Sequence, residues 1–433
     1  MRPLRHVPKF RAAITALAGF LFALLGATGC TSPVRLDAVP VANQPKASVA
    51  GMPDMRYWAD GDASDFMRDA LESVRRERDL LQRAGHRGPL PPAEFLAISG
   101  GGEDGAFGAG LLVGWSAAGT RPRFKGVTGI STGALIAPFA FLGPEYDEKL
   151  KDVYTTITSK DILEQRDFLA AITNDAMADT KPLRKLVQRI VDQSMLDAIE
   201  AEHEKGRILL IGTTNLDARR PVIWNVGKIA ASHHPQALEL VRTLLVASAA
   251  IPGAFPPVMI SVEADGQKFE EMHVDGGATA QVFVYPPSLN IRTASQQEGI
   301  TRQRRLFVIR NARLDPDWAQ VERRTLSIAN RAVSSLIQTQ GVGDLYRIYI
   351  AAQRDDIDFN LAYIPESFKT LLREPFDPVY MKELFKVGYD LAVNGYPWAK
   401  TPPGYAAPEI EPPLPPRTAK VATGKRRAAG AGS

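Results

Sequence analysis

The chain has 433 residues, a formal net charge of +4 and a single cysteine, Cys30. This length suffices for one large domain or two moderate ones. Four basic residues and no acidic ones precede Cys30 (Arg2, Arg5, Lys9 and Arg11), so the rest of the chain is formally neutral. That balance argues against a nucleic-acid-binding surface. One cysteine excludes an intrachain disulfide and a cysteine-based zinc site, and the six histidines form no HExxH motif, so we expect neither metal nor cofactor.

The N-terminus has the layout of a bacterial export signal. A basic stretch at 1–11 precedes an apolar run at 12–27, which ends in Ala27-Thr28-Gly29-Cys30. The run of about 16 residues is shorter than the ~20 that a spanning helix needs. Its ending resembles a lipobox, which implies that residues 1–29 are removed and that Cys30 carries a lipid anchor. An ordinary cleaved signal and an uncleaved anchor are the alternatives. We expect the protein in the bacterial cell envelope, on the periplasmic side and at the outer membrane.

The regions around the main domain differ in composition. Residues 30–60 are rich in Pro, Ala and Val and are expected to form a tether. Residues 61–94 are expected to be helical, because apolar residues recur at helical spacing over 65–83. This amphipathic helix is expected to pack on the main domain, with membrane contact as the alternative. Residues 401–433 are rich in Pro and Ala, then basic, and predict a disordered tail.

Strands and helices alternate from Phe95 onward. The expected strands are 95–98, 127–130, 208–213 and 306–309, with a hairpin formed by 258–262 and 268–274 around Ala264-Asp265-Gly266. The expected helices are 106–118, a stretch from Thr132, 236–249 and 326–353. This alternation predicts a three-layer α/β/α sandwich with a mainly parallel central sheet. We expect a catalytic domain at 95–289 and a C-terminal part at 290–400 packed on it.

The first chemical motif is Gly129-Ile130-Ser131-Thr132-Gly133, a G-x-S-x-G sequence. Such a motif places a serine on a sharp turn between a strand and a helix, where its hydroxyl is presented outward. The N-terminus of the following helix favours negative charge nearby. The motif predicts a nucleophile at Ser131, and a tight turn without chemistry is the alternative.

The second motif is the glycine-rich loop Gly100-Gly101-Gly102-Glu103-Asp104-Gly105, between a strand and a helix. Its unpaired N–H groups can bind an anion, either a nucleotide phosphate or the oxyanion of acyl transfer. A nucleotide site needs an acidic ribose partner about 20 residues further on. Residues 119–127 are basic instead, and the oxyanion hypothesis also accounts for the serine motif.

The third motif is Asp275-Gly276-Gly277, after the second hairpin strand. A plain turn is the simplest interpretation of this motif alone. No histidine follows Asp275, so a triad in the α/β-hydrolase order Ser, Asp, His cannot use this aspartate. If Ser131 is a nucleophile, a carboxylate base is the simplest alternative.

These three motifs, in this order, resemble those of the patatin-like phospholipase family. The segments 214–221 and 247–258 also look like that family, and the resemblance covers roughly Phe95 to Pro287. It implies a patatin-like fold, Ser131 as nucleophile and Asp275 as proton acceptor. It further implies that Gly100, Gly101 and Gly102 supply the oxyanion donors. Asp104 departs from the pattern, because the family's loop commonly has Arg or Lys there. The glycines expected to support the motifs are Gly105, Gly129, Gly133, Gly276 and Gly277.

The expected activity is hydrolysis of carboxylic esters of lipids, as in a phospholipase A or lysophospholipase, without a metal. The expected partners are lipid ester substrates and a membrane surface reached through the N-terminal anchor. A transacylase would use the same residues. The alternative from another class is a non-catalytic lipoprotein that binds acyl chains or a protein partner on a hydrolase scaffold.

Overall fold

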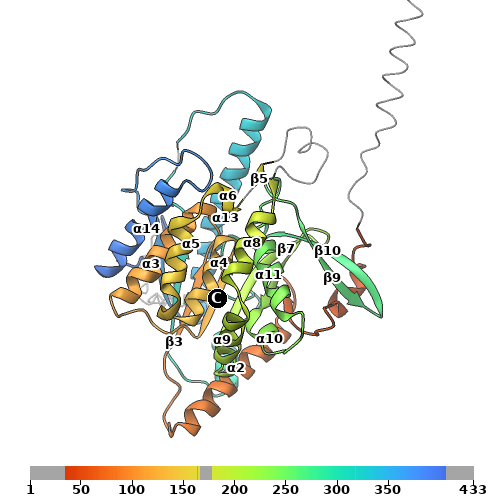
Figure 1. Ribbon diagram of the computed structural model, residues 1–433. Helices are drawn as coiled ribbons and strands as arrows, with labels where there is room; N and C mark the ends of the chain where they lie inside the picture. Colours follow the sequence, from red (N-terminus) through yellow and green to blue (C-terminus); the bar gives the residue numbers. More distant parts are fainter. Residues whose placement is uncertain (1–34, 163, 166–177, 317, 406–433) are drawn as a thin grey trace, which may run out of the picture. The chain divides into compact units, whose positions relative to one another are not determined.

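The computed structural model describes residues 35–162, 164–165, 178–316 and 318–405 (Figure 1). Internal contacts group residues 1–402 into one unit, which holds every helix and strand below, and residues 403–433 into another. The described residues form a ten-stranded mixed sheet and, separately, a small pair of strands, β5 (Glu164–Gln165) and β6 (Ala178–Asp179). The strands of the large sheet are β1 (Ser48–Val49), β2 (Arg56–Trp58), β3 (Ala93–Ile98), β4 (Gly126–Ile130), β7 (Ile208–Asn215), β8 (Arg220–Asn225), β9 (Val258–Ala264), β10 (Gln267–Asp275), β11 (Arg304–Arg310) and β12 (Asp358–Tyr363).

Five neighbouring strands run parallel, in the order β7-β4-β3-β11-β12, and β12 lies at the edge of the sheet. Ile98 pairs with Gly129 on one side and with Ile309 on the other. The segments that follow β3, β4 and β11 therefore leave the sheet side by side. Ligand sites of open α/β sheets form at this carboxyl edge.

The antiparallel part of the sheet brings β10 to the same place. The hairpin of β9 and β10 turns at Asp265 and Gly266, both at positive φ, which suits the tight turns that join two strands. Asp275 at the end of β10 pairs with Thr213 of β7, while Gly212 pairs with Ile130 of β4. The register of three strands thus places Asp275 beside the residue that follows Ile130, which is Ser131.

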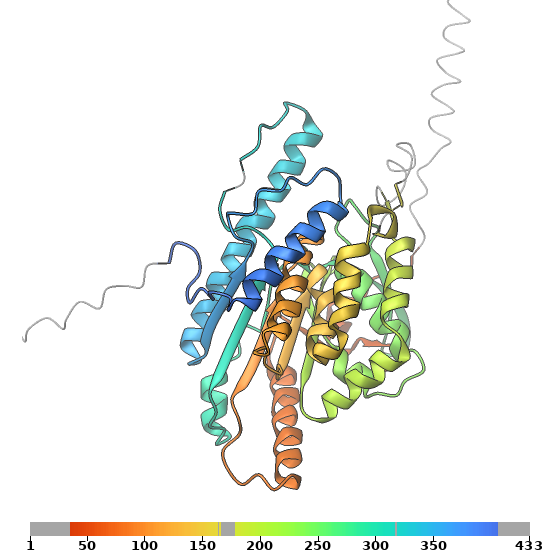
Figure 2. The same ribbon diagram turned by 60° about the vertical axis from the view of Figure 1, so that its left-hand side comes forward.

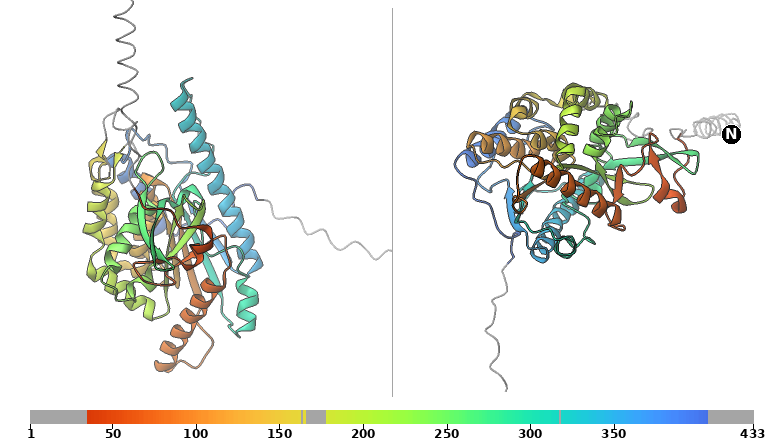
Figure 3. Two further views of the ribbon diagram at one scale, coloured as in Figure 1. Left: turned by 90° about the vertical axis from the view of Figure 1, so that its right-hand side faces the viewer. Right: turned by 90° about the horizontal axis from the view of Figure 1, so that it is seen from below.

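Helices cover both faces of the sheet (Figure 3), which confirms the predicted α/β/α fold. One face carries α3 (Gly105–Ala117), α4 (Thr132–Leu142), α5 (Asp147–Thr156), α8 (Lys181–Ile190), α9 (Gln193–Glu204), α10 (Val226–Ala230), α11 (Ala237–Ser248) and α14 (Pro378–Val393). The other carries α2 (Ser64–Arg83), α12 (Ile291–Gln297) and α13 (Thr325–Arg354). A short helix, α6 (Ser159–Ile162), packs on α8.

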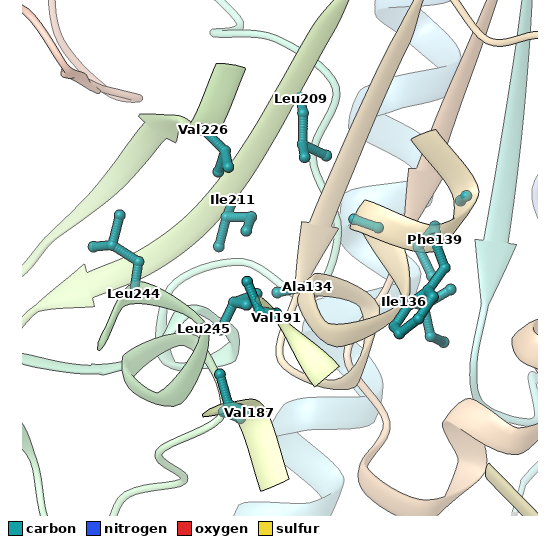
Figure 4. Close-up of a cluster of buried hydrophobic side chains, with 14 of the residues drawn as sticks. Ala134, Ile136, Phe139, Val187, Val191, Leu209, Ile211, Val226, Leu244 and Leu245 are labelled. Atoms are coloured by element: carbon teal, nitrogen blue, oxygen red, sulfur yellow. The ribbon is translucent and has the colours of Figure 1, made fainter. Parts of the chain in front are cut away.

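Alternating side chains of β7 supply both hydrophobic layers. Leu209 and Ile211 join the main core, whereas Leu210 joins a second cluster with Phe66 of α2 on the opposite face. Successive side chains of a strand point to opposite faces, so a continuously apolar strand can serve two layers. Figure 4 shows the main core around β7, with Ile211 near Leu245.

Helix α14 packs on α3 at very short range. Ideal Cβ atoms built on Gly110 and Gly114 of α3 would lie 2.0 Å and 2.4 Å from the carbonyl oxygens of Phe385 and Tyr389. Only glycine permits this approach. Gly110 lies against Phe385, and Gly114, four residues later, lies against Tyr389, also four residues later. Both helices therefore run in the same direction, away from the carboxyl edge of the sheet.

The expected tether is wrong where the structure describes it. Val49 and Val39 are buried, and β1 pairs with β9, so residues 35–58 lie on the domain instead of extending from it. The physical reason is that β1 pairs with β9, which would otherwise expose unpaired backbone groups at the edge of the sheet. Cys30, the expected signal at 1–29 and residues 406–433 of the expected tail lie outside the described residues.

Helix α2 agrees with the amphipathic prediction. It buries Phe66, Asp69 and Ser73 against the domain, as expected for a helix packed on the sheet. Among the residues that the structure describes, no helix is long and apolar enough to cross a membrane.

Candidate active site

Ser131 occupies a strained turn between β4 and α4. Its backbone has φ 55° and ψ −125°, a conformation that costs energy in a residue with a Cβ atom. A Cβ on Gly129 would lie 2.3 Å from the carbonyl oxygen of Gly133, and one on Gly133 would lie 2.3 Å from that of Ile98. Both glycines of the motif are therefore required by close backbone contacts. Only 6% of the surface of Ser131 is exposed.

The backbone of this turn is held by a hydroxyl from the end of α11. The N–H of Ser131 donates to Oγ of Ser248 at 3.0 Å, and this hydroxyl donates to the carbonyl oxygen of Gly212 at 2.7 Å. Ser248 is completely buried. It links the serine turn to β7, and it was not among the residues expected from the sequence.

Asp275 meets Ser131 at the carboxyl edge. The Ser131 hydroxyl lies near enough to the Asp275 carboxylate to lower its pKa. The N–H of Gly277 donates to Oδ1 of Asp275 at 2.7 Å. Burial raises the pKa of Asp275 to about 6, although the Ser131 hydroxyl and the Gly277 N–H oppose the shift. A buried carboxylate with few donors thus faces a serine hydroxyl.

Gly276 follows Asp275 for a steric reason. An ideal Cβ on Gly276 would lie 2.6 Å from the carbonyl oxygen of Gly212 and 3.1 Å from Cγ2 of Ile130. Its backbone must therefore press on β7 and β4. This contact brings the aspartate close to the serine.

The glycine-rich loop lies next to Ser131, but its three glycines differ. An ideal Cβ on Gly100 would lie 3.2 Å from Cβ of Ser131. The N–H of Gly100 donates to the carbonyl oxygen of Gln281 at 3.0 Å, so the expectation that Gly100 is an oxyanion donor is wrong. The N–H groups of Gly101 and Gly102 donate to no acceptor in the described part of the chain. Gly102 begins a short 3₁₀ helix (Gly102–Asp104), whose first N–H groups have no partner within it.

Two side chains, at the end of β11 and directly after it, donate hydrogen bonds to the glycine-rich loop and to the residue before it. Arg310 is buried, and its Nη1 donates to the carbonyl oxygen of Gly100 and to Oγ of Ser99, both at 3.2 Å. Asn311 donates through its side chain to the carbonyl oxygen of Ser99 at 3.0 Å. An ideal Cβ on Gly101 would lie 2.2 Å from the carbonyl oxygen of Asn311. The loop is therefore fixed from a strand far away in the sequence.

Asp104 is turned toward α14. Oδ1 of Asp104 accepts a hydrogen bond of 2.5 Å from the hydroxyl of Tyr380. Burial, with a smaller contribution from Glu103, raises the pKa of Asp104 to about 7, although Tyr380 and Arg310 oppose the shift. Burial lowers the pKa of Arg310 to about 10, and Asp104 opposes that effect. Asp104 thus joins the loop to α14 and faces a buried cation.

The remaining motif glycine, Gly105, begins α3 where that helix passes α4. An ideal Cβ on Gly105 would lie 2.1 Å from Oγ1 of Thr132. The same Oγ1 shares a hydrogen bond of 2.6 Å with the hydroxyl of Tyr154. Gly105 therefore supports the motif by allowing two helices to meet behind Ser131.

The histidine nearest to Asp275 in sequence has other partners. His273 is completely buried, with Nε2 3.1 Å from Glu271 and Nδ1 3.0 Å from Thr213. Burial lowers the pKa of His273, although Glu271 opposes the shift. Within the described residues, no three His, Cys, Asp or Glu side chains are grouped to hold a metal ion.

An apolar cavity of about 310 Å³ adjoins the site on the α13 face of the sheet. Ile130 and Gly276, the neighbours of Ser131 and Asp275, form part of its wall. Val222, Phe283 and Ile348 contribute apolar surface. Cavities of this size and character accept apolar parts of small ligands.

Several residues of the site were not predicted from the sequence. Gln281 accepts the Gly100 N–H, donates through Nε2 to the carbonyl oxygen of Gly277 at 2.8 Å and donates through its N–H to Asp344. It therefore joins two predicted motifs to α13. Arg310 was detectable in principle, since it directly follows the predicted parallel strand 306–309, at the end where functional side chains gather. Gln281 and Ser248 carry no such signal.

A comparison with known protein families agrees with the motifs. The model of a family described as patatin-like phospholipase matches residues 96–286. A solved structure, VipD from Legionella pneumophila, is similar at 12% sequence identity and a TM-score of 0.31, over 70% of this chain and 66% of that chain. No curated protein matches the sequence. Residues 96–286 therefore form the part of the chain that matches the patatin-like phospholipase family.

Proposed function

We propose that this protein is a serine acyl hydrolase that cleaves carboxylic esters of lipids, with Ser131 as nucleophile and Asp275 as its proton acceptor. The observation that carries the proposal is that the strand register places the Ser131 hydroxyl beside the buried Asp275 carboxylate, whose pKa it lowers. The match of residues 96–286 to a phospholipase family supports the reaction class. A positioned base within hydrogen-bonding reach is what an unactivated serine hydroxyl needs.

The proposed reaction has two halves. Oγ of Ser131 attacks the ester carbonyl carbon while its proton moves to Asp275. The tetrahedral intermediate collapses, the C–O bond to the alcohol breaks, and the alcohol leaves with the proton from Asp275. Water then attacks the acyl-enzyme, again giving a proton to Asp275, and the acid leaves as Ser131 regains its hydrogen. Two easier steps replace one difficult step.

The pKa of Asp275, about 6, suits this role. At neutral pH the carboxyl group is largely ionised and can accept a proton. It is also a stronger base than an ordinary carboxylate, because burial disfavours its charge. General bases work best when their pKa lies near the working pH.

The N–H groups of Gly101 and Gly102 are the proposed oxyanion donors. They belong to the loop beside Ser131, and neither has an acceptor in the described chain. Each such donor typically lowers the barrier by ~3–4 kcal/mol. The N-terminus of α4 adds a favourable field for the developing negative charge.

The apolar cavity beside Ile130 and Gly276 supports a substrate with a hydrocarbon chain. An acyl or alkyl group leaving water for such a space gains about 0.8 kcal/mol per buried CH₂ group. We therefore infer that lipid esters are better substrates than short, polar esters.

We also propose that Cys30 carries a lipid that attaches the protein to the bacterial cell envelope, on the periplasmic side and at the outer membrane. The apolar run and the Ala27-Thr28-Gly29-Cys30 ending support this location. Growth of a producing strain with a labelled fatty acid tests it. Label is expected on the wild-type chain and not on Cys30→Ala. Equal labelling of both chains would contradict the anchor.

Hydrolysis of a panel of phospholipids, lysophospholipids and neutral lipids tests the activity. Ser131→Ala and Asp275→Asn are each expected to remove hydrolysis without loss of folding, as circular dichroism would show. Thr156→Ala is the control, because this exposed hydroxyl of α5 bonds only a helix carbonyl. Lipid binding without turnover by the wild-type chain would favour a non-catalytic binding lipoprotein instead.

A further inference from the structure

Helix α13 extends beyond the sheet at the edge where Ser131 lies. It follows β11 and precedes the parallel strand β12, so it runs opposite to both. Its 30 residues span about 45 Å, whereas the seven residues of β11 span about 23 Å. Gly341 lies against the side chain of Arg310, the last residue of β11, because an ideal Cβ on Gly341 would lie 2.6 Å from Nη2 of that arginine. Residues 325–340, here called the overhang, therefore project past the carboxyl edge (Figure 2).

The overhang turns its apolar side toward solvent. Ile328, Val333, Leu336 and Ile337 are 54%, 54%, 69% and 39% exposed. Residues 328, 332 and 336 are spaced by four, as are 329, 333 and 337, so all six share one side of the helix. Ala329 and Ala332 complete this side and are also exposed.

The polar side of the overhang faces the protein. Gln338 lies on that side, and its Nε2 donates to the carbonyl oxygen of Asp315 at 3.2 Å. An ordinary surface helix has the opposite arrangement, with its apolar stripe on the core. The orientation of the overhang is therefore suited to a partner outside the domain.

Exposed apolar side chains gather at this edge from other segments as well. Trp318 is 85% exposed in the connection from β11 to α13, and Leu371 is 80% exposed in the connection from β12 to α14. Both connections start at carboxyl ends of parallel strands. Of the 16 large hydrophobic residues exposed in the described chain, eight lie in 318–337 and 371–372, so half of them belong to the segments at this edge. Clusters of this kind mark interaction surfaces.

We propose that the overhang, together with Trp318 and Leu371, contacts the surface of an anionic lipid bilayer and brings the site to its substrate. Residues 318–337 contain three arginines (Arg323, Arg324 and Arg331) and one acidic residue, Glu322, a net charge of +2. Apolar side chains beside basic ones bind the interface of anionic membranes. The same positive charge disfavours a second copy of this chain as the partner. The inference rests on the proposed function, since it assigns the bilayer as the source of the lipid ester.

A fluorescent probe on the overhang tests the contact without any hydrolysis. Leu336→Cys in a full-length Ser131→Ala chain is labelled with an environment-sensitive dye and mixed with vesicles of phosphatidylethanolamine and phosphatidylglycerol. Lipids carrying a quencher on the acyl chain are expected to quench the dye strongly. The control site is Val393→Cys, exposed at the far end of α14. The labelled Ser131→Ala parent chain shows any background from Cys30.

Two results would overturn the proposal. One is a dye at position 336 that is quenched no more than the dye at position 393. The other is a blue shift at position 336 that appears without vesicles and grows with protein concentration, which would identify a second copy as the partner.

A serine variant separates this inference from the proposed function. Val333→Ser combined with Leu336→Ser is expected to lower hydrolysis of vesicle lipid by about tenfold or more, because each side chain loses its transfer into lipid. Hydrolysis of a soluble short-chain ester is expected to be unchanged. Equal rates on vesicles for variant and wild type would refute the membrane contact alone. Absence of wild-type activity on both substrates would instead refute the proposed function.

Discussion

The main-chain N–H of Ser131 donates a 3.0 Å hydrogen bond to the hydroxyl of Ser248, so a residue of α11 fixes the turn that presents the proposed nucleophile. Ser248 passes the interaction on to the carbonyl oxygen of Gly212 at 2.7 Å. A strained backbone persists only where surrounding contacts hold it. The hydroxyl of Ser248 is one of these contacts.

Replacing Ser248 tests this relationship. In Ser248→Ala the N–H of Ser131 and the carbonyl oxygen of Gly212 both lose a buried partner. The free energy of unfolding is expected to fall by about 1–3 kcal/mol for each group left unpaired. Displacement of the nucleophile is expected to lower kcat by about ten- to a hundredfold, with KM little changed. Urea unfolding and steady-state kinetics measure the two effects. The exposed Thr156→Ala serves as control, and equal effects of both substitutions would show that Ser248 has no positioning role.

The pH dependence of activity is expected to follow Asp275. This carboxyl group accepts a proton only when it is ionised, and its pKa is raised to about 6 by burial. The value of kcat/KM should therefore rise with pH, pass its midpoint near pH 6 and level off above it. A rate profile on a soluble ester checks this. A rate that stays constant down to about pH 4 would mean that the base has an ordinary carboxyl pKa.

The stability of the wild-type chain, compared with that of Asp275→Asn, is expected to depend on pH in the opposite sense to activity. A folded-state pKa of about 6, above the ordinary 3.8, means that the folded chain holds the proton more tightly than the unfolded chain. The carboxyl group therefore lowers stability as pH rises from about 4 to 6, by about 3 kcal/mol in full. The asparagine variant lacks this loss, so it should be more stable than wild type at pH 7 and similar near pH 4. A less stable variant at pH 7 would show that the ionised carboxylate stabilises the fold.

Two neighbouring glycines offer a matched pair in the proposed oxyanion loop. A Cβ on Gly101 would lie 2.2 Å from the carbonyl oxygen of Asn311, whereas one on Gly102 would meet nothing within 4 Å. Gly101→Ala must displace the loop and is expected to lower kcat by about a hundredfold. Gly102→Ala retains its N–H and should mainly cost about 1–2 kcal/mol of stability, because its φ is +58°. Equal losses of kcat in both variants would contradict this account of the loop.

The sequence predicted the elements on which the site is built, because their signals are local. Apolar runs that end in glycine-rich turns marked β3 and β4, and Asp265-Gly266 marked the hairpin that leads to Asp275. These predictions succeeded where strand periodicity and turn chemistry act within a few residues. The family resemblance then supplied the proposed roles of the residues.

The failures concern contacts that no local pattern encodes. The N–H of Gly100 is occupied by the carbonyl oxygen of Gln281, a pairing that depends on how two distant loops meet. Residues 35–58 have a composition typical of a tether, yet Val39 and Val49 are buried and β1 pairs with the distant strand β9. Asp104 departs from the basic residue that is common at this place in the family's loop, and in the structure it accepts a hydrogen bond from Tyr380 of α14. In each case the partner lies far along the chain.

Covalent labelling of Ser131 tests the central claim most directly. The folded wild-type chain is treated with a fluorophosphonate, digested and sequenced by mass spectrometry. The account predicts one modified serine, Ser131, no label in Ser131→Ala and slower labelling in Asp275→Asn. Active wild-type protein that carries the label on another serine, or that stays unlabelled at Ser131, would contradict it.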